Sequence, residues 1–412
     1  MKGAYISIRR LCILILILSV GFALPEAALA GGPVHGARAV GMGTAFNAVA
    51  DDPSAILFNP AGLTQVKGAS IYGGVTAVIL STTYTNLSGV SEETEFQVFF
   101  PPHLYVTSDL WTEDLVFGVG LYSPFGIGGR KWSSAGLTRY ASTESIIATY
   151  SVNPTVAWRA LPAVSIAFGL DYMRSTIETE RMLDQSAFGA ADANTRLEAD
   201  GGGWGYNLGV LLFPGHDVRI GLVYRSAIRI NYRGDLAANG LAPALGFSQY
   251  SSPVSTTSRF PEIYGLGISY KSTEKLLLAA DVELVRWSSF KRMDLDIHQE
   301  VPPFADSSTP LDWKDSWQYK IGAEYRVNDT VSLRCGYAYI RTSVPDHTLE
   351  PGNPDADQHN FSVGGGYRSS PVWIDGFYNI GVFEDRKVNN AILSGEYKNI
   401  IHYVGLSVGR SF

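Results

Sequence analysis

The sequence predicts an all-β fold: a transmembrane antiparallel β-barrel of about fourteen strands, with a small N-terminal hatch plugging the lumen. Beyond residue 30, apolar or aromatic residues alternate with small or polar ones in about fourteen short stretches. The connectors between these stretches are alternately short and long, as in outer-membrane barrels. Only helices and closed barrels pair every backbone group inside a bilayer, and the long apolar run, 11–20, lies in the N-terminal leader. We therefore expect a closed barrel.

The first thirty residues have the order of a secretory signal peptide. A positively charged start precedes the apolar run 11–24, and Ala28-Leu29-Ala30 supplies the small residues of a cleavage site. The basic residues of the start are Lys2, Arg9 and Arg10. A retained membrane anchor would need a longer apolar run. Cleavage leaves Cys335 as the one cysteine of the mature chain, which excludes an internal disulfide.

Composition agrees with a membrane barrel. The chain has 32 basic and 39 acidic residues, and removing the three basic residues and one acidic residue of the leader leaves 29 and 38, a balance of about −9. This balance argues against nucleic acid as a partner. Forty-three glycines, 22 tyrosines and only 17% charged residues suit strands with a lipid face, aromatic girdles and a lumen of small and polar side chains.

The alternation places strands, turns and loops along the chain. Strands are expected near 69–80, 97–108, 114–123, 143–159, 163–178, 200–213, 217–233, 257–270, 274–291, 314–327, 330–342, 358–369, 371–384 and 396–412. The short connectors, expected to be periplasmic turns, lie around 161–162, 214–216, 272–273, 328–329 and 369–371. The long connectors, expected to be extracellular loops, are 124–142, 179–199, 234–256, 292–313, 343–357 and 385–395. Both termini then lie in the periplasm.

A period of two also assigns the two faces of each strand. In the last strand, Val404, Leu406 and Val408 should face lipid, and Gly405 and Ser407 the lumen. The same parity points Tyr264, Leu266, Ile268 and Tyr270 outward. A terminal Phe412 after such alternation resembles the assembly signal that the outer-membrane insertion machinery recognises. Arg410 departs from the aromatic or apolar residue usual two places earlier.

Several cations are expected to face the lumen by the same parity. They are Arg225, Arg229, Arg233, Lys320 and Arg334. Three of them, Arg225, Arg229 and Arg334, are candidate partners for a carboxylate head group, because the guanidinium group binds carboxylates with two parallel donors. The alternative is that these cations pair with lumenal acids, of which the candidates are Asp171, Asp281, Glu283 and Glu324.

The segment before the first strand, 36–63, does not alternate like a strand. It contains Asn59-Pro60-Ala61 followed by Gly62, and it resembles the N-terminal hatch of the FadL/TodX family, which carries an Asn-Pro-Ala motif. The resemblance implies a fourteen-stranded outer-membrane transporter of long-chain fatty acids or other hydrophobic compounds, plugged by a small N-terminal domain. We expect a signal peptide over 1–30, a hatch over 31–67 and a barrel over 68–412. Asn59 either only shapes a turn of the plug or acts directly in moving substrate.

Pro124, Phe125 and Gly126 come directly after the third expected strand, 114–123, or continue it. Proline donates no ladder hydrogen bond and glycine weakens pairing, so the strand should kink or end there. Resemblance to the family implies that a kink opens a side window, through which an apolar substrate leaves into the outer leaflet. The alternative is that Pro124 simply starts the following loop.

Two expected outer loops carry apolar residues. Trp132, Leu137 and Tyr140 lie in one, and Leu241 and Phe247 lie in another. Exposed apolar clusters often mark sites that capture apolar ligands. The alternative is that these side chains pack against each other and order the loops.

Neither an enzyme nor a resident cofactor or metal is expected. Residues 405–409 match G-x-S-x-G, but the hydrolase elbow needs a strand-to-helix turn with Asp and His downstream, and only three residues follow Gly409. Asp355, Asp357 and His359 lack a full set of metal ligands.

The expected function is passive uptake of hydrophobic molecules, long-chain fatty acids or aromatic hydrocarbons, by a monomeric barrel in the outer membrane of a Gram-negative bacterium. The expected partners are the apolar substrate, outer-membrane lipid and, during assembly, the insertion machinery. The main alternative is a structural barrel or adhesin whose loops bind a surface partner. A general polar porin is disfavoured by the plug.

Overall fold

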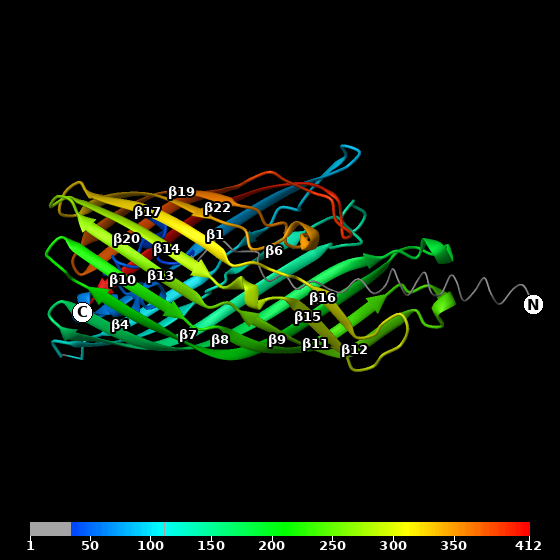
Figure 1. Cartoon of the computed structure of the whole chain (residues 1–412), viewed down its shortest axis with the longest axis horizontal. Coiled ribbons are helices and arrows are strands. Elements are labelled where there is room, and N and C mark those ends of the chain that lie inside the picture. Colours follow the sequence, from blue (N-terminus) through cyan, green and yellow to red (C-terminus); the bar gives the residue numbers. More distant parts are fainter. Residues whose placement is uncertain (1–33, 111) are drawn as a thin grey trace, which may run out of the picture.

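The computed structural model describes residues 34–110 and 112–412 of the chain (Figure 1). Its strands form one antiparallel sheet that closes on itself, because the first strand, β1 (Ala69–Asn86), pairs with the last, β22 (Gly395–Ser411). The expected signal peptide, 1–30, lies outside these residues. Within them, no helix is long and apolar enough to cross a membrane.

The barrel has 14 strand positions, as predicted, and some positions consist of two or three consecutive strands. After β1 they are β2 (Ser91–Glu93) with β3 (Val98–Phe99) and β4 (Pro102–Ser108); β5 (Leu115–Tyr122) with β6 (Ile127–Lys131); β7 (Glu144–Leu161); β8 (Val164–Leu183); β9 (Ala193–Leu212); β10 (Val218–Arg225) with β11 (Ile228–Asn239); β12 (Gln249–Phe260) with β13 (Ile263–Lys271); β14 (Leu276–Val285) with β15 (Arg292–Ile297); β17 (Ser316–Arg326); β18 (Val331–Ile340); β19 (Gln358–Ser369); β20 (Val372–Phe383); and β22. Two short strands, β16 (Ser307–Pro310) and β21 (Arg386–Val388), lie in the long connectors. The connectors also contain three 3₁₀ turns, η2 (Ser186–Phe188), η3 (Pro243–Leu245) and η5 (Asp346–Thr348), and a fourth, η4 (Trp287–Ser289), separates β14 from β15.

The short connectors gather at the end of the barrel where the C-terminus lies (Figure 1). The predicted turns are therefore confirmed, but two predicted loops, 179–199 and 234–256, are mostly strand. Only 184–192 separates β8 from β9, and only 240–248 separates β11 from β12. At about 3.3 Å per residue, the 20 residues of β8 extend well beyond the 9–11 residues that span a bilayer. These strands continue past the membrane, which explains why their outer parts are polar.

The predicted alternation of faces is confirmed in the last strand and in β13. Val404, Leu406 and Val408 are 50%, 53% and 46% exposed, whereas Gly405 and Ser407 are buried. Along the outer surface, the rings of Tyr206, Tyr224 and Tyr264 form a row, with centroid distances of 5.7 and 5.1 Å. A row of outward tyrosines is typical of the girdle at a membrane–water interface.

The expectation that Arg229 and Arg233 face the lumen is wrong. Eight positions separate Arg225 from Arg233, but only seven separate their β9 partners, Asn207 and Asp200. The strand therefore gains one residue between β10 and β11, and a one-residue shift moves every later side chain to the opposite face. Arg229 and Arg233 are exposed on the outside of the barrel, while Ile228, Ile230 and Tyr232 point inward.

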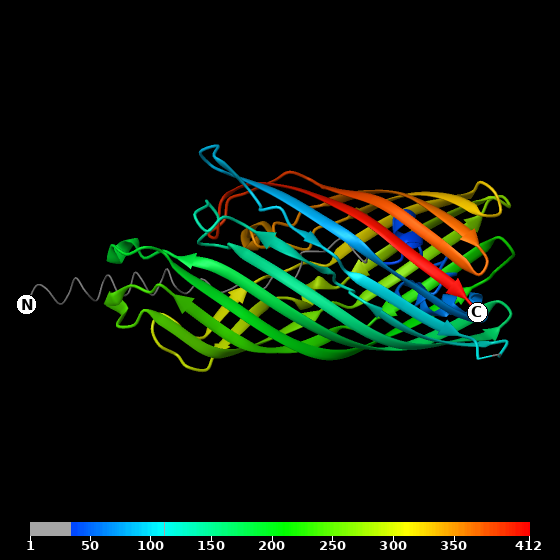
Figure 2. The same ribbon diagram turned by 180° about the vertical axis from the view of Figure 1, so that it is seen from behind.

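Residues 34–66 form a plug inside the barrel, in the half nearer the C-terminus (Figure 2). The plug comprises α2 (Ala37–Gly41), α3 (Ala55–Phe58) and η1 (Pro60–Gln65), and nearly all of its residues are buried. Phe46 and Phe58 pack edge to face, with ring centroids 5.4 Å apart. They belong to an apolar cluster that also takes in wall residues such as Tyr105 and Leu211, so the plug and the wall share one core.

Candidate functional site

A network of buried charges fixes the plug to the wall. Arg38 of α2 binds Glu324 of β17 through two donors, at 2.8 and 2.9 Å, and also pairs with Asp51 of the plug. Arg334 of β18 binds the same Glu324 at 2.6 Å and binds Asp375 of β20 at 2.7 Å. Burial raises the pKa of Asp51, but the nearby Arg38 and Arg219 outweigh it, so the pKa lies below its ordinary value. The carboxylate is therefore held in its charged form.

The Asn59-Pro60-Ala61 motif forms a turn that rests against the wall. The Asn59 Oδ1 accepts a hydrogen bond from the Ala61 N–H at 3.1 Å, and Pro60 begins η1. The Asn59 Nδ2 donates to the Asn47 carbonyl at 2.8 Å and to the Val210 carbonyl of β9 at 3.1 Å. At Gly62, an added Cβ would lie 2.0 Å from the Ala50 carbonyl oxygen. The motif therefore connects two plug segments with the barrel.

The third strand is interrupted at Pro124, Phe125 and Gly126, and it resumes as β6. Gly126 has a φ of 83°, which favours glycine, and its carbonyl accepts hydrogen bonds from the backbone N–H and the hydroxyl of Thr149, both at 3.0 Å. The Phe125 N–H donates to the Thr149 Oγ1 at 3.2 Å. The strand therefore bends at this point and does not end in a loop.

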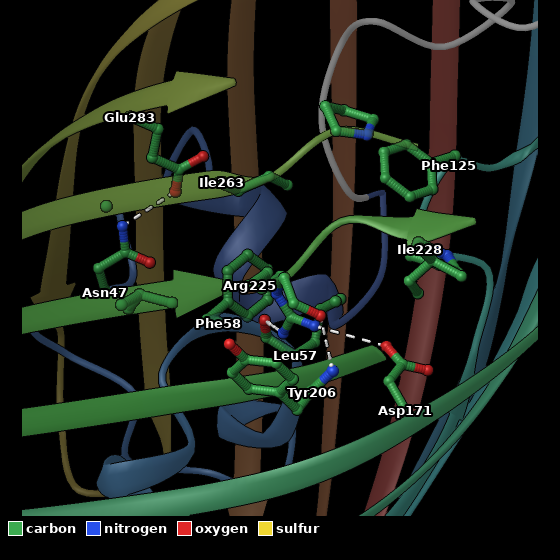
Figure 3. A pocket seen from close by; sticks show the side chains of 15 residues that line it. Asn47, Leu57, Phe58, Phe125, Asp171, Tyr206, Arg225, Ile228, Ile263 and Glu283 are labelled. Atoms are coloured by element: carbon green, nitrogen blue, oxygen red, sulfur yellow. Dashed lines mark hydrogen bonds and ion pairs between the residues drawn. The ribbon is translucent and has the colours of Figure 1, made fainter. Parts of the chain in front are cut away.

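A cavity lies between this interruption and the plug (Figure 3). Its apolar lining comes from the plug, the third strand and the seventh and eighth strand positions. These residues are Leu57, Phe58, Pro124, Phe125, Val223, Ile228, Pro261 and Ile263. Polar side chains close its sides, among them Asn47, Asp171, Arg225 and Glu283. Only about 60 Å³ is open to the centre of a water molecule. A molecule larger than a few atoms would have to displace part of the lining.

Arg225 is the one predicted carboxylate partner that lines this cavity. Its guanidinium donates to the carbonyls of Ile56 and Leu57 at the end of α3, and to the Tyr122 hydroxyl at 3.3 Å. Asp171 lies 3.9 Å away. The other two candidates lie elsewhere, since Arg334 is paired with Glu324 and Asp375 beside α2 and Arg229 is outside the barrel. Lys320 pairs with Glu283 at 2.7 Å, as the alternative of lumenal ion pairs predicts.

Aromatic side chains close the cavity on the extracellular side. The ring of Phe125 lies 4.7 Å from that of Phe260 and 6.0 Å from that of Trp287. Trp287 contacts Trp313 in turn at 5.2 Å. No site role was predicted for Phe260 or Trp287. The adjacent Pro261 marks the strand break, but the sequence does not reveal that this break lies opposite Phe125 across the lumen.

Trp132 and Leu241 are buried, as the alternative of packing that orders the outer loops predicts. Trp132 is 1% exposed and its Nε1 donates to the Pro351 carbonyl at 3.0 Å, and Leu241 is 3% exposed. Leu137 and Phe247 are half-buried against the same apolar cluster. Tyr140 is 37% exposed, and its hydroxyl donates to Asp192. These residues mainly order the outer half of the barrel.

The motif at 405–409 lies within β22 and not at a strand-to-helix turn. Ser407 is buried at the joint between plug and wall, where its Oγ accepts a hydrogen bond from the Ala37 N–H at 3.0 Å and lies 2.9 Å from the His103 Nε2. The serine therefore holds α2 in place.

Possible metal ligands in the described residues are engaged by protein partners. Asp355, Asp357 and His359 hydrogen-bond to three different side chains, Thr342, Tyr339 and Tyr337. A second group consists of Glu144, Glu178 and Glu180, whose oxygens lie within 4.8 Å of one another. Arg196 pairs with two of these glutamates and with Glu198, and Lys131 pairs with the third.

Glu350, in the outer loop after β18, makes that loop sensitive to pH. Burial raises the pKa of Glu350 to about 7, and Arg181 only partly offsets this. The folded loop therefore holds the proton more tightly than the unfolded chain does, and its stability falls as the pH rises from about 4.5 through 7. We expect protease cleavage between 343 and 357 to be about tenfold faster at pH 8 than at pH 5.

Limited proteolysis with a protease of constant activity over this range measures the effect. Glu350→Gln keeps the shape of the side chain without its charge, and should make the cleavage rate almost independent of pH. An unchanged pH profile in Glu350→Gln would assign the effect to another group.

The C-terminal Phe412 lies outside the barrel and is 74% exposed. Its N–H donates to the Ala69 carbonyl at 2.8 Å, and the Arg410 guanidinium lies 4.9 Å from the centre of its ring. Arg410, the residue that departs from the usual assembly signal, therefore has its guanidinium group over the ring of Phe412.

Three comparisons find proteins similar to this chain. Residues 19–412 match the family model for the outer membrane protein transport protein (OMPP1/FadL/TodX). The long-chain fatty acid transport protein of Escherichia coli O6:H1 is 23% identical over 399 residues, which cover 85% of this chain and 86% of the relative. The crystal structure of a Pseudomonas aeruginosa FadL homologue has a TM-score of 0.83 at 19% identity, covering 93% of this chain and 100% of the homologue. The Pseudomonas putida toluene transporter TodX has a TM-score of 0.71 at 17% identity, covering 88% and 94%.

Proposed function

This chain belongs to the family of outer membrane protein transport proteins (OMPP1/FadL/TodX), and from this membership we propose that it takes up hydrophobic molecules by passive diffusion, without covalent chemistry. It is a β-barrel of the Gram-negative outer membrane. In this proposal residues 31–67 act as a hatch and 68–412 as the barrel. The protein works as a monomer, and the insertion machinery recognises Phe412 during assembly.

The observation that carries the proposal is the apolar cavity between the plug and the interruption of the third strand. Above it, the outer half of the barrel contains an apolar cluster that includes Trp132, Phe260 and Trp287. A hydrophobic molecule that enters from outside therefore stays in apolar surroundings down to Phe125 and the plug residues Leu57 and Phe58. The molecule first contacts outer-loop residues, namely Tyr140, which is exposed, and Leu137 and Phe247, which are half-buried.

Two movements complete the route. The cavity is too small for a substrate, so the plug around α3 shifts to make room. The molecule then leaves sideways at Pro124, Phe125 and Gly126, where the wall has no regular hydrogen-bond ladder. Lateral exit avoids the polar lower lumen, where Arg38 and Arg334 lie among carboxylates. No energy source is needed, because the substrate moves down its own gradient.

The cargo is either a long-chain fatty acid or an aromatic hydrocarbon. One relative is named as a long-chain fatty acid transport protein and another as a toluene transporter, so the family spans both kinds of molecule. Arg225 is the cation that lies in position to bind a carboxylate in the cavity. To do so, its guanidinium group would donate to the carboxylate and give up its hydrogen bonds to the Ile56 and Leu57 carbonyls. A fatty acid that binds there would also loosen the end of α3.

The test is uptake by cells that lack their own transporter and express this chain. Labelled long-chain fatty acid and labelled toluene are supplied separately, and an empty vector is the control. Uptake of either compound above the control supports the proposal and separates the two kinds of cargo. If neither enters although the folded barrel is in the outer membrane, the proposal fails and binding of a surface partner by the loops becomes the better explanation.

Filling the cavity should block the route while the barrel remains folded. Phe125→Trp adds atoms beside about 60 Å³ of open space, and we expect uptake to fall at least about threefold. Phe361→Trp is the matched control, because Phe361 is 52% exposed on the lipid face and should tolerate the larger ring. Equal uptake by the two variants would exclude a route past Phe125.

A further inference from the structure

We propose that the outer surface of β9, β11 and β12 binds the phosphate groups of the glycolipid in the outer leaflet, through Arg229, Arg233 and Arg259. The three strands lie side by side in the wall (Figure 1). Such a lipid site is separate from the transport route inside the barrel, and it requires only that the chain is in the outer membrane.

The three arginines form a compact patch on one face. Arg229 of β11 and Arg259 of β12 are direct partners in the antiparallel register, and Arg233 lies four residues further along β11 on the same face. All three side chains are exposed. Directly opposed residues have Cβ atoms only about 5 Å apart, so two guanidinium groups at such positions can reach the same anion.

The patch lies at the height of lipid head groups. Arg229 follows β10, whose outward Tyr224 belongs to the tyrosine row with Tyr206 and Tyr264. On the other side of this row, towards the periplasm, the outward residues are apolar: Leu208, Leu222 and Leu266 are 42%, 43% and 53% exposed. The tyrosines mark the boundary of the hydrocarbon, and the arginines begin just beyond it. At this depth the available anions are the phosphates of the lipid.

Nearby acids balance only part of the charge of the patch. Asp200, which lies opposite Arg233 in the register with β9, pairs with Arg174 at 2.7 Å, and Glu262 pairs with Arg259 at 3.3 Å. Within residues 34–110 and 112–412, no ion pair joins Arg229 or Arg233 to an acid. Like charges that face each other across two strands destabilise the pairing, and a bound anion removes this cost. The guanidinium group fits phosphate especially well, because it can donate two parallel hydrogen bonds.

The extra residue between β10 and β11 is what creates the patch. Without it, Arg229 and Arg233 would point into the lumen, where acids such as Asp171 are available. With it, the wall turns both cations towards the membrane just beyond the girdle. An extra residue that served only to bend the strand would not require arginine at the positions that it turns to the outside of the barrel.

The test measures lipid binding by the purified mature barrel in uncharged detergent. Its unfolding temperature is followed as purified lipopolysaccharide is added, and again with the same lipopolysaccharide after removal of its phosphates. We expect the phosphorylated form to stabilise the protein and the dephosphorylated form to have little effect. For the Arg229→Gln/Arg259→Gln variant, the concentration needed for half the effect should rise at least about tenfold.

The matched control is Arg341→Gln/Lys398→Gln, which removes two exposed charges away from the patch, one directly after β18 and one on β22, and should titrate like the unaltered protein. All these side chains are exposed, so a shift of the protein band on heating should confirm that each variant folds. The proposal is overturned if dephosphorylated lipid stabilises equally, or if the two double variants titrate alike. It also falls if the loss of the arginines changes only the oligomeric state, because the partner is then another copy of the chain.

Discussion

Replacing Arg38 with methionine should release the plug and give a barrel that conducts small ions. The Arg38 side chain is only 9% exposed and binds Glu324 and Asp51, with Asp52 at 3.7 Å. Methionine fills similar space but removes one cation from a group of three carboxylates, of which Glu324 keeps Arg334 and Asp51 keeps Arg219 as partners. Breaking a buried ion pair on one side costs about 3–5 kcal/mol, which is enough to dislodge a small plug from its seat. Conductance of single barrels in planar bilayers measures the result.

The size of the lumen makes the effect large. Barrels of eight strands are filled by their own side chains, whereas those of about sixteen hold an aqueous channel. Fourteen strands without a seated plug should therefore pass ions, and we expect conductance at least about tenfold above the unaltered protein.

Arg174→Met is the control, because this arginine is 59% exposed and pairs with Asp200 outside the lumen. An Arg38→Met barrel that stays as closed as the Arg174→Met barrel would show that apolar contacts alone hold the plug.

Strand parity was predictable wherever a strand is continuous. In β22 and β13 the period of two assigned the lipid and lumen faces of every residue considered, because one face must be apolar. The same rule failed at Arg229, since one extra residue after Arg225 inverts all later positions. A local pattern of side chains cannot show such an insertion, which is defined only by the pairing with β9.

The parts of the candidate site were predictable to different extents. Asn59-Pro60-Ala61 and Pro124 to Gly126 carry local signals, a capping side chain and a residue without a donor, and both form the irregular backbone that these signals predict. The partners of these segments were not predictable. That Phe125 meets Phe260 and Trp287 depends on closure of the whole barrel, which brings together positions more than 130 residues apart. The burial of Trp132 beneath Pro351 has the same origin.

The second large effect is expected where the plug lies directly on the wall. At Gly336 of β18, an added Cβ would lie 2.2 Å from both the Gly43 nitrogen and the Met42 carbonyl carbon. At Gly322 of the neighbouring β17, an added Cβ would lie 2.2 Å from the Met42 carbonyl oxygen. These contacts join backbone to backbone, so no change of rotamer can relieve them. The two glycines form a flat surface on which the plug rests.

Gly336→Ala should therefore prevent the plug from seating, at a cost of about 3 kcal/mol or more. A barrel that folds around a displaced plug should conduct ions as the Arg38 variant does, and a barrel that requires the plug during folding should be depleted from the outer membrane. Gly365→Ala on the adjacent β19 is the matched control, because the nearest atom to its added Cβ is the Ser332 carbonyl oxygen, at 3.9 Å. Normal levels and a closed lumen in Gly336→Ala would mean that the plug can move by more than 1 Å without losing its seal. In that case the buried charges around Arg38, and not the fit of the two backbones, would determine where the plug sits.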